Sequence, residues 1–259
     1  MLIANPIYDV VFKYMMEDLK VAKTLISAII GEEVEELDFC PQELITKYKE
    51  GSMTVVRADF LARIKTSEGY KEVIIELQKA LLSSDIQRFR RLVDLQNQSV
   101  NNVFENRMAH ACIFFLGHAL GNTDIPVLTV TNQVRDRSTG EELQLRQEFI
   151  DSLHNKSWIV QISKLKEPRR DDLEKLLSIF DQSNIKYSNH ILIVNEEDFP
   201  ETFKHVIRRL IKAAESKEVS EQMTAEDEVI SELQHLERVI ASKEEFIEKQ
   251  CYPVIFAAC

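Results

Sequence analysis

The sequence predicts a mixed fold of the α/β or α+β class, with a central β-sheet flanked by helices and a long C-terminal helix. Segments with a two-residue apolar period are interleaved with segments of a three- to four-residue period, as expected when strands and helices share one domain. Two alternating segments, 55–65 and 71–79, are separated by a short polar turn, which indicates a hairpin. Residues 224–249 carry a heptad-like apolar repeat, which indicates a long helix.

Composition is that of a soluble globular protein. The 259 residues suffice for one large domain or two small ones, and 44% are hydrophobic and 29% charged. No apolar run approaches the roughly 20 residues of a membrane helix, and the opening MLIANPIYD lacks the features of a signal peptide. The four cysteines are scattered, which favours neither a zinc site nor a disulfide framework. We expect a cytoplasmic protein without membrane contact.

The first helix is predicted over residues 6–30, with a break near Glu17 and Asp18. Apolar residues recur every three or four positions and form one stripe. Asn5 is expected to cap the start, and Gly31 fits the position just past the end. Residues 32–48 are less regular and place Glu43 on a possible strand or loop.

The register of the predicted hairpin follows from its turn. Residues 66–69 are polar and end in glycine, as expected of a short hairpin loop. With Ser67 and Glu68 at the tip, the numbers of paired residues sum to 135. Asp59 then lies opposite Glu76, and Arg57 lies opposite Gln78. A slip by one residue would send the side chains of the second strand to the other face.

The remaining elements follow from the same two periodicities. A helix over 83–104 carries Arg88, Arg90 and Arg91, and it starts close enough to the hairpin for these arginines to border it. The continuous apolar run 111–116 indicates a buried strand. Further strands are predicted at 127–134, 158–162 and 190–194, and further helices at 171–180, 200–214 and from 224 or 225 to 249.

Asp59, Glu76 and Gln78 share one face of the predicted hairpin. Opposed strand residues lie about 4.5–5.5 Å apart at Cβ, and two carboxylates at that distance repel each other unless a proton or a cation lies between them. Mg²⁺ prefers oxygen ligands and lowers the pKa of an attacking water. We therefore expect Asp59 and Glu76 to be metal ligands, and Gln78 to orient the water. The same spacing also fits a solvated hairpin face.

The motif and its surroundings resemble a known nuclease family. Asp59, followed by Glu76-Leu77-Gln78 on the next strand, looks like the D…ExQ variant of the PD-(D/E)XK motif. The opening NPIYDVVFKYMMED is similar to that of the Rpn-type recombination-promoting nucleases and of the related PD-(D/E)XK nuclease family transposases. DIQRFRRL after the motif matches as well, and GEELQLRQEFIDSL and LEKLLSIFDQSNI resemble longer transposase members.

This resemblance implies a restriction-endonuclease-like core and a DNA endonuclease that depends on Mg²⁺ or Mn²⁺. Asp59 and Glu76 would be its metal ligands, and Gln78 would replace the usual lysine. Because glutamine has no charge, this departure removes a group that often activates the water.

Accessory roles follow from the same resemblance. Arg88 and Arg91 would contact DNA phosphates, although an exposed helix face paired with nearby acids explains them equally well. Glu43 is a candidate for the upstream acidic residue, but it also fits an ordinary surface position. Lys79 is adjacent to the motif, yet strand alternation directs it to the opposite face unless the strand ends or bulges there.

The acidic charge is concentrated near the C-terminus. Residues 217–249 hold ten Asp or Glu against four Lys or Arg, so this segment contributes −6 to the net charge of −11. We predict a nuclease-like domain over 1–216, elaborated after about residue 105, and an acidic helical extension over 217–259. The alternative function is a catalytically inactive nuclease-fold protein that binds partners through this helix. The heptads fit either a homodimer seam or packing against the helix's own domain.

Overall fold

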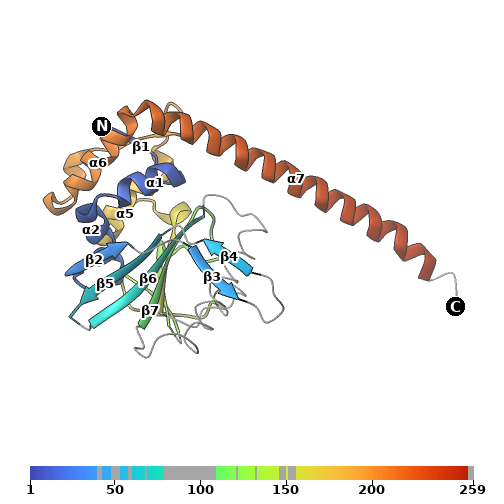
Figure 1. Ribbon diagram of the computed structural model, residues 1–259, viewed down its shortest axis with the longest axis horizontal. Coiled ribbons are helices and arrows are strands. Elements are labelled where there is room, and N and C mark those ends of the chain that lie inside the picture. Colours follow the sequence, from blue (N-terminus) through green and yellow to red (C-terminus); the bar gives the residue numbers. More distant parts are fainter. Residues whose placement is uncertain are drawn as a thin grey trace.

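The computed structural model describes residues 1–39, 43–47, 53–57, 60–67, 69–78, 109–120, 122–131, 133–145, 150 and 156–255. Within these residues the fold is mixed α/β, and it ends in a long helix, as predicted. Figure 1 shows helices α1, α2, α5 and α6 gathered on one side of the main sheet, while α7 extends away from the domain. None of the described helices has the length and apolar composition needed to cross a membrane.

The main sheet has eight strands within the described residues, in the order β10-β9-β8-β11-β7-β6-β5-β2. Its strands are β2 (Glu36–Phe39), β5 (Phe60–Thr66), β6 (Gly69–Gln78), β7 (Ala109–Leu116), β8 (Val127–Val130), β9 (Val134–Asp136), β10 (Glu142–Leu143) and β11 (Lys156–Gln161). Strand β7 runs parallel to both β6 and β11, and the other neighbouring strands are antiparallel. The sheet is therefore mixed, as the sequence predicts.

Two further sheets of two strands each are present in the described part of the chain. One pairs β1 (Leu2–Ala4) with β12 (Ile191–Ile193), and the other pairs β3 (Glu43–Lys47) with β4 (Met53–Arg57). The helices are α1 (Asp9–Met16), α2 (Leu19–Ile30), α5 (Asp172–Leu177), α6 (Lys204–Glu215) and α7 (Lys217–Ile255). Short 3-10 helices are η1 (Ile162–Lys164), η2 (Ser178–Phe180), η3 (Gln182–Asn184), η4 (Glu196–Asp198) and η5 (Glu201–Phe203).

Alternate residues of the central strands enter two separate apolar cores. On β7, Ile113 and Phe115 join the larger core that the helices cover, whereas Phe114 and Leu116 join a smaller core on the other face. The Phe115 ring lies 5.2 Å from the Phe12 ring of α1 and 4.9 Å from the Phe180 ring, centroid to centroid. Both faces of β7 are thus buried, which explains its continuous apolar sequence.

The N-terminal helical segment divides where the sequence predicts. Helix α1 ends at Met16, and Asp18 caps α2 by accepting hydrogen bonds from the Lys20 and Val21 N–H groups at 3.0 and 3.3 Å. Gly31 follows α2 with φ of 75°, a left-handed conformation that favours glycine. The expected Asn5 cap is wrong. Helix α1 begins only at Asp9, so the Asn5 Oδ1, which accepts a hydrogen bond from the Ile7 N–H at 3.2 Å, closes a turn before the helix. The Asn5 amide nitrogen donates to Gln182 Oε1 at 2.8 Å.

Replacing Asp18 with alanine is expected to lower the free energy of unfolding by about 1 kcal/mol, because two N–H groups of α2 lose their acceptor. Chemical denaturation of the variant and the wild type measures this difference. Glu33→Ala, at an exposed position after the same helix, is the matched control and should leave stability nearly unchanged. Equal stability of Asp18→Ala and the wild type would contradict the capping role.

Three predicted boundaries require correction. The predicted strand 55–65 is two strands in different sheets, because β4 finds its hydrogen-bond partner in β3. The predicted strand 127–134 is likewise two strands, β8 and β9, which form a hairpin through the Val130–Val134 pair. Helix α7 begins at Lys217 rather than at 224 or 225, because Val219 and Met223 are buried in the main core.

Candidate functional site

The β5–β6 hairpin has the register that the sequence predicts. Paired residues run from Phe60–Ile75 to Thr66–Gly69, and the numbers in each pair sum to 135. Gly69 closes the turn with φ of 114°, where a side chain would strain the backbone. Ala62 and Val73 form one pair and are fully buried, so the apolar face lies where alternation puts it. The register is therefore confirmed over the described part of the hairpin.

The candidate catalytic residues of β6 lie near the carboxyl end of the strand. Glu76 pairs with Phe114 of β7, and Gln78 pairs with Leu116. Leu116 also pairs with Gln161 at the end of β11. The parallel strands β6, β7 and β11 thus end in one row. In α/β sheets, ligands commonly bind beyond the carboxyl ends of parallel strands.

The strand pairings in the described part of the chain do not bring the other predicted site residues to the carboxyl ends of β6, β7 and β11. Asp59, Lys79, Arg88 and Arg91 lie outside the described residues. Glu43 is at the start of β3, opposite Arg57 of β4. The expected Arg57–Gln78 pair is wrong, because β4 belongs to the two-stranded sheet and not to the β5–β6 hairpin.

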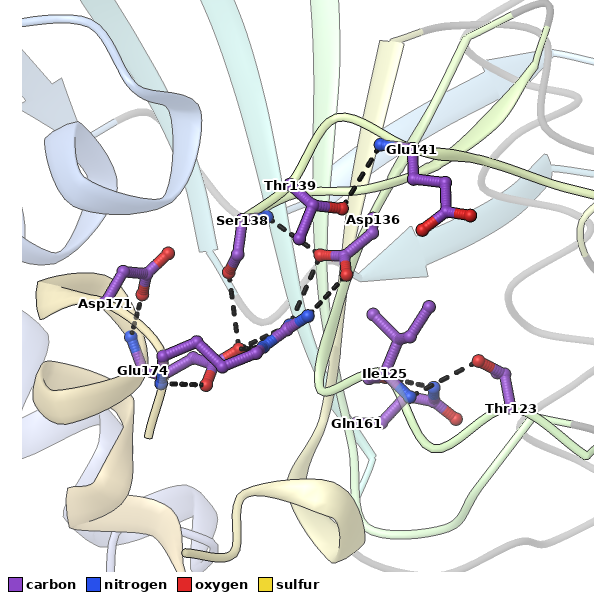
Figure 2. Close-up of polar contacts among 10 residues, drawn as sticks. Thr123, Ile125, Asp136, Ser138, Thr139, Glu141, Gln161, Asp171 and Glu174 are labelled. Atoms are coloured by element: carbon purple, nitrogen blue, oxygen red, sulfur yellow. Dashed lines mark hydrogen bonds and ion pairs between the residues drawn. The ribbon is translucent and has the colours of Figure 1, made fainter. Parts of the chain in front are cut away.

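A buried glutamine fixes the loop at this edge of the sheet (Figure 2). Gln161 is fully buried at the end of β11. Its Oε1 accepts a hydrogen bond from the Leu120 N–H at 2.6 Å, and its Nε2 donates to the Ile125 carbonyl at 2.7 Å. One amide therefore holds two points of the connection between β7 and β8.

Replacing Gln161 with leucine is expected to lower the free energy of unfolding by about 2 kcal/mol, because the Leu120 N–H and the Ile125 carbonyl lose their partners in a buried setting. Urea denaturation followed by circular dichroism measures the change. Gln144→Leu, at an exposed position, introduces the same side chain without breaking this contact. Stability equal to that of the control would show that the amide does not anchor the loop.

A polar network joins the end of β9 to α5 (Figure 2). The Arg170 Nε donates to Glu174 Oε1 at 2.7 Å, and its Nη2 donates to Asp136 Oδ1 at 3.2 Å. Asp136 and Glu174 are only 3% and 2% exposed. Ser138 Oγ donates to Glu174 Oε1 at 3.3 Å. One guanidinium thus serves two buried carboxylates.

The guanidinium keeps the buried aspartate ionised. Burial is the largest influence on Asp136 and acts to raise its pKa, but the hydrogen bonds from Arg170 and the Ser138 N–H, together with the charge of Arg170, outweigh it and lower the pKa. For Arg170 itself, burial opposes the charged form, yet its hydrogen bonds to Glu174 and Asp136 raise its pKa. Asp136 and Arg170 therefore both stay charged across the neutral pH range.

A cleft of about 450 Å³ borders this network and includes Ser163, Lys164 and Lys166. The Ser163 hydroxyl is buried and has no hydrogen-bond partner in the described part of the chain. Lys164 Nζ lies 2.6 Å from Asp124, and Arg170 is held by the network, so much of the positive charge is neutralised. These pairings argue against an open phosphate-binding site in the cleft.

One histidine lies close to the carboxyl edge. His118 is two residues beyond Leu116, the partner of Gln78. Its Nδ1 is buried without a hydrogen-bond partner among the described residues, and burial lowers its pKa. The imidazole is therefore neutral at pH 7.

The donor chemistry of the candidate site suits a hard divalent cation. Asp59, Glu76 and Gln78 offer only oxygen atoms as ligands, as Mg²⁺ prefers. The described residues, which include Glu76 and Gln78 but not Asp59, contain no cluster of three or more His, Cys, Asp or Glu that could hold a metal ion. The match between this site and a divalent cation therefore rests on the oxygen ligands of Asp59, Glu76 and Gln78 alone.

Sequence inspection missed the network and the edge residues, because no local spacing marks them. Asp136 and Arg170 are distant in sequence, and Gln161 ends an apolar strand without any motif. The matched acidic and basic residues in the segment 163–174 are a weak signal. Comparisons with protein-family models, with curated proteins and with solved structures find no match to this chain.

Proposed function

We propose that the protein is a Mg²⁺- or Mn²⁺-dependent DNA endonuclease of the PD-(D/E)XK superfamily, with a restriction-endonuclease-like core. The observation that carries the proposal is the register of the β5–β6 hairpin. Its pairs sum to 135 up to Phe60–Ile75, so one further pair in the same register would be Asp59 and Glu76. This is the pair of opposed carboxylates that the motif requires. An association with mobile elements or recombination is part of the proposal, by the resemblance alone.

Several features of the described fold support it. Glu76 and Gln78 lie near the carboxyl end of β6, where three parallel strands end together. Helices α1 and α2 precede the hairpin strands and pack on one face of the sheet (Figure 1). Strand β6 is held between the antiparallel β5 and the parallel β7. Its side chains therefore project from a rigid element, as catalytic residues require.

Each residue has a distinct role in the proposed reaction. Asp59 and Glu76 would hold the divalent ion, which would supply a water of lowered pKa and positive charge beside the scissile phosphate. Gln78 accepts a hydrogen bond from the attacking water and orients it, since its amide does not titrate. Arg88 and Arg91 bind neighbouring phosphates, and Glu43 and Lys79 are accessory candidates. The products are a phosphate end and a hydroxyl end of the DNA chain.

The experiment incubates the purified protein with supercoiled plasmid and Mg²⁺ or Mn²⁺, with and without a chelator, and repeats the assay with Asp59→Ala. Cleavage that needs the metal and disappears in the variant is the expected result. Cleavage that survives the substitution would refute the site. No cleavage by the wild type with either metal, on supercoiled or single-stranded DNA, would count against the activity.

A second candidate function is supported by α7. This helix leaves the domain and exposes apolar side chains, among them Leu233 and Leu236, 40% and 49% exposed. An inactive nuclease-fold protein that binds partners through α7 would have these features as well. Folded wild-type protein without metal-dependent cleavage, but with α7-dependent assembly, would favour this second function.

A further inference from the structure

Helix α7 consists of a docked part and a free part. Val219 and Met223 are buried in the main core, 6% and 1% exposed. The Glu226 carboxylate accepts a hydrogen bond from the Asp9 N–H at 2.9 Å, and Asp227 accepts one from the Tyr8 hydroxyl at 2.8 Å. These contacts fix the start of α7 to α1. Beyond them, Figure 1 shows the helix running out from the domain.

The free part carries an apolar seam, which we define as Val229, Leu233, Leu236 and Ile240. They are 56%, 40%, 49% and 54% exposed, respectively. Their spacing of four, three and four residues is that of the core positions of a coiled coil. In proteins most of the stability of a helix comes from tertiary packing of its apolar face, and this seam has no such packing among the described residues, as its exposure shows. The seam therefore needs a partner.

The seam does not continue the face that docks on the domain. At about 100° per residue, the seam lies roughly a quarter turn around the helix from the buried Val219 and Met223, and Glu226 lies between the two faces. A rigid α7 that keeps its docking contacts therefore presents the seam away from α1. Relative to the described part of the chain the four seam residues stay 40–56% exposed, so a separate helix can bind there.

We propose that the seam binds the same seam of a second copy of this chain in an antiparallel coiled coil. The seam residues are self-complementary about a two-fold axis between positions 234 and 235. Leu233 then packs on Leu236 of the second copy, and Val229 packs on Ile240 of the second copy. Such an isologous contact closes as a dimer. The inference is independent of the proposed nuclease activity.

The charges at the ends of the seam select the antiparallel orientation. Glu226 precedes the seam by one core position, and Lys243 follows it by one core position. Antiparallel helices place Lys243 of the second copy beside the Glu226 carboxylate, which also accepts the hydrogen bond from the Asp9 N–H, so opposite charges meet at each end. Parallel helices would place Lys243 against Lys243 and Glu226 against Glu226, which is repulsive. Charge complementarity thus favours a second copy and one orientation.

The first test compares oligomeric state across protein concentrations by analytical ultracentrifugation of the full chain. The wild type is expected to dimerise, and Leu233→Glu is expected to raise the dissociation constant at least about a hundredfold, because a carboxylate would be buried in the seam. Ser231→Glu, on the opposite face of the same helix, is the matched control and should dimerise like the wild type. Circular dichroism checks that all three chains are folded.

The second test determines orientation by mixing variants. Leu233→Glu and Leu236→Lys should each be monomeric alone, but their mixture should form a heterodimer. In antiparallel helices the introduced carboxylate of one chain meets the introduced ammonium of the other, whereas in parallel helices each meets a leucine. A wild type that is monomeric at every concentration, a dimer insensitive to Leu233→Glu, or a mixture that stays monomeric would overturn the proposal.

Discussion

The Glu76→Ala variant is expected to lose metal-dependent DNA cleavage by about a thousandfold. Removing one of two carboxylates that hold the ion deprives the transition state of several kcal/mol of stabilisation, and about 4 kcal/mol corresponds to a factor of one thousand. Initial rates of plasmid nicking, measured over a range of Mg²⁺ concentrations, give the change. Calorimetric titration with Mn²⁺ in the absence of DNA should show weaker binding in the same variant.

Glu72→Ala is the matched control for this prediction. Glu72 lies on the same strand, four residues before Glu76, and pairs with Arg63 of β5. A general loss of carboxylate charge, or a weakened strand, would affect both variants alike. Equal activity of Glu72→Ala and Glu76→Ala would contradict a specific role for Glu76. Gln78→Ala is expected to have a smaller effect, about ten- to a hundredfold, because it orients rather than holds the ion.

The hairpin register could be predicted because every determinant of it is local. Alternation sets the face of each strand, and the turn at Ser67 and Gly69 sets the pairing. The same is true of the helix break, since Asp18 caps α2 and Gly31 follows it within the same short segment. Short-range signals of this kind do not depend on the rest of the fold.

The partner of β4 could not be predicted in the same way. Its pairing with β3 joins Arg57 to Glu43, 14 positions earlier in the sequence, and an alternating sequence is compatible with either neighbour. The chain divides between β4 and β5 because β4 pairs with β3 while β5 pairs with β6. The alternation of apolar residues does not say which neighbour a strand pairs with. The Asn5 cap failed for another reason. Its Oδ1 does accept from the nearby Ile7 N–H, but the helix starts only at Asp9. The rest of the amide binds Gln182, far along the chain.

The buried network was invisible for a different physical reason. Asp136 and Glu174 are acidic residues, which a sequence pattern assigns to the surface. They can be buried because the Arg170 guanidinium lies between them and donates hydrogen bonds to both. Asp136 lies far from the other two residues in sequence, so only the folded structure brings the three together. The free energy of unfolding should therefore depend strongly on Arg170, although no sequence motif marks its role.

Replacing Arg170 with methionine is expected to lower the free energy of unfolding by about 4 kcal/mol at neutral pH, because two buried carboxylates lose their counter-charge. Lys175→Met is the matched control. Lys175 lies on α5, five residues after Arg170, and pairs with Asp172 at 2.9 Å, but these side chains are 44% and 67% exposed, so the change should be below about 1 kcal/mol. Similar losses in both variants would mean that the network contributes no more than a surface ion pair.

Acid should change the free energy of unfolding of the wild type and of Arg170→Met in opposite directions through the Asp136 carboxyl. In the wild type the pKa of Asp136 lies below its ordinary value of 3.8, so its contribution to stability is present above that pH and is lost as the pH falls further. Without the guanidinium, burial dominates and raises the pKa of the same carboxyl. The variant then regains stability relative to the wild type as the pH falls from 7 towards 4. Urea denaturation at pH 7 and at pH 4 measures the difference in free energy of unfolding between the two proteins. A difference that widens in acid would contradict this assignment.

Adding Asp136→Asn to Arg170→Met should recover part of the lost free energy of unfolding, since one of the two carboxylates left without a partner is removed.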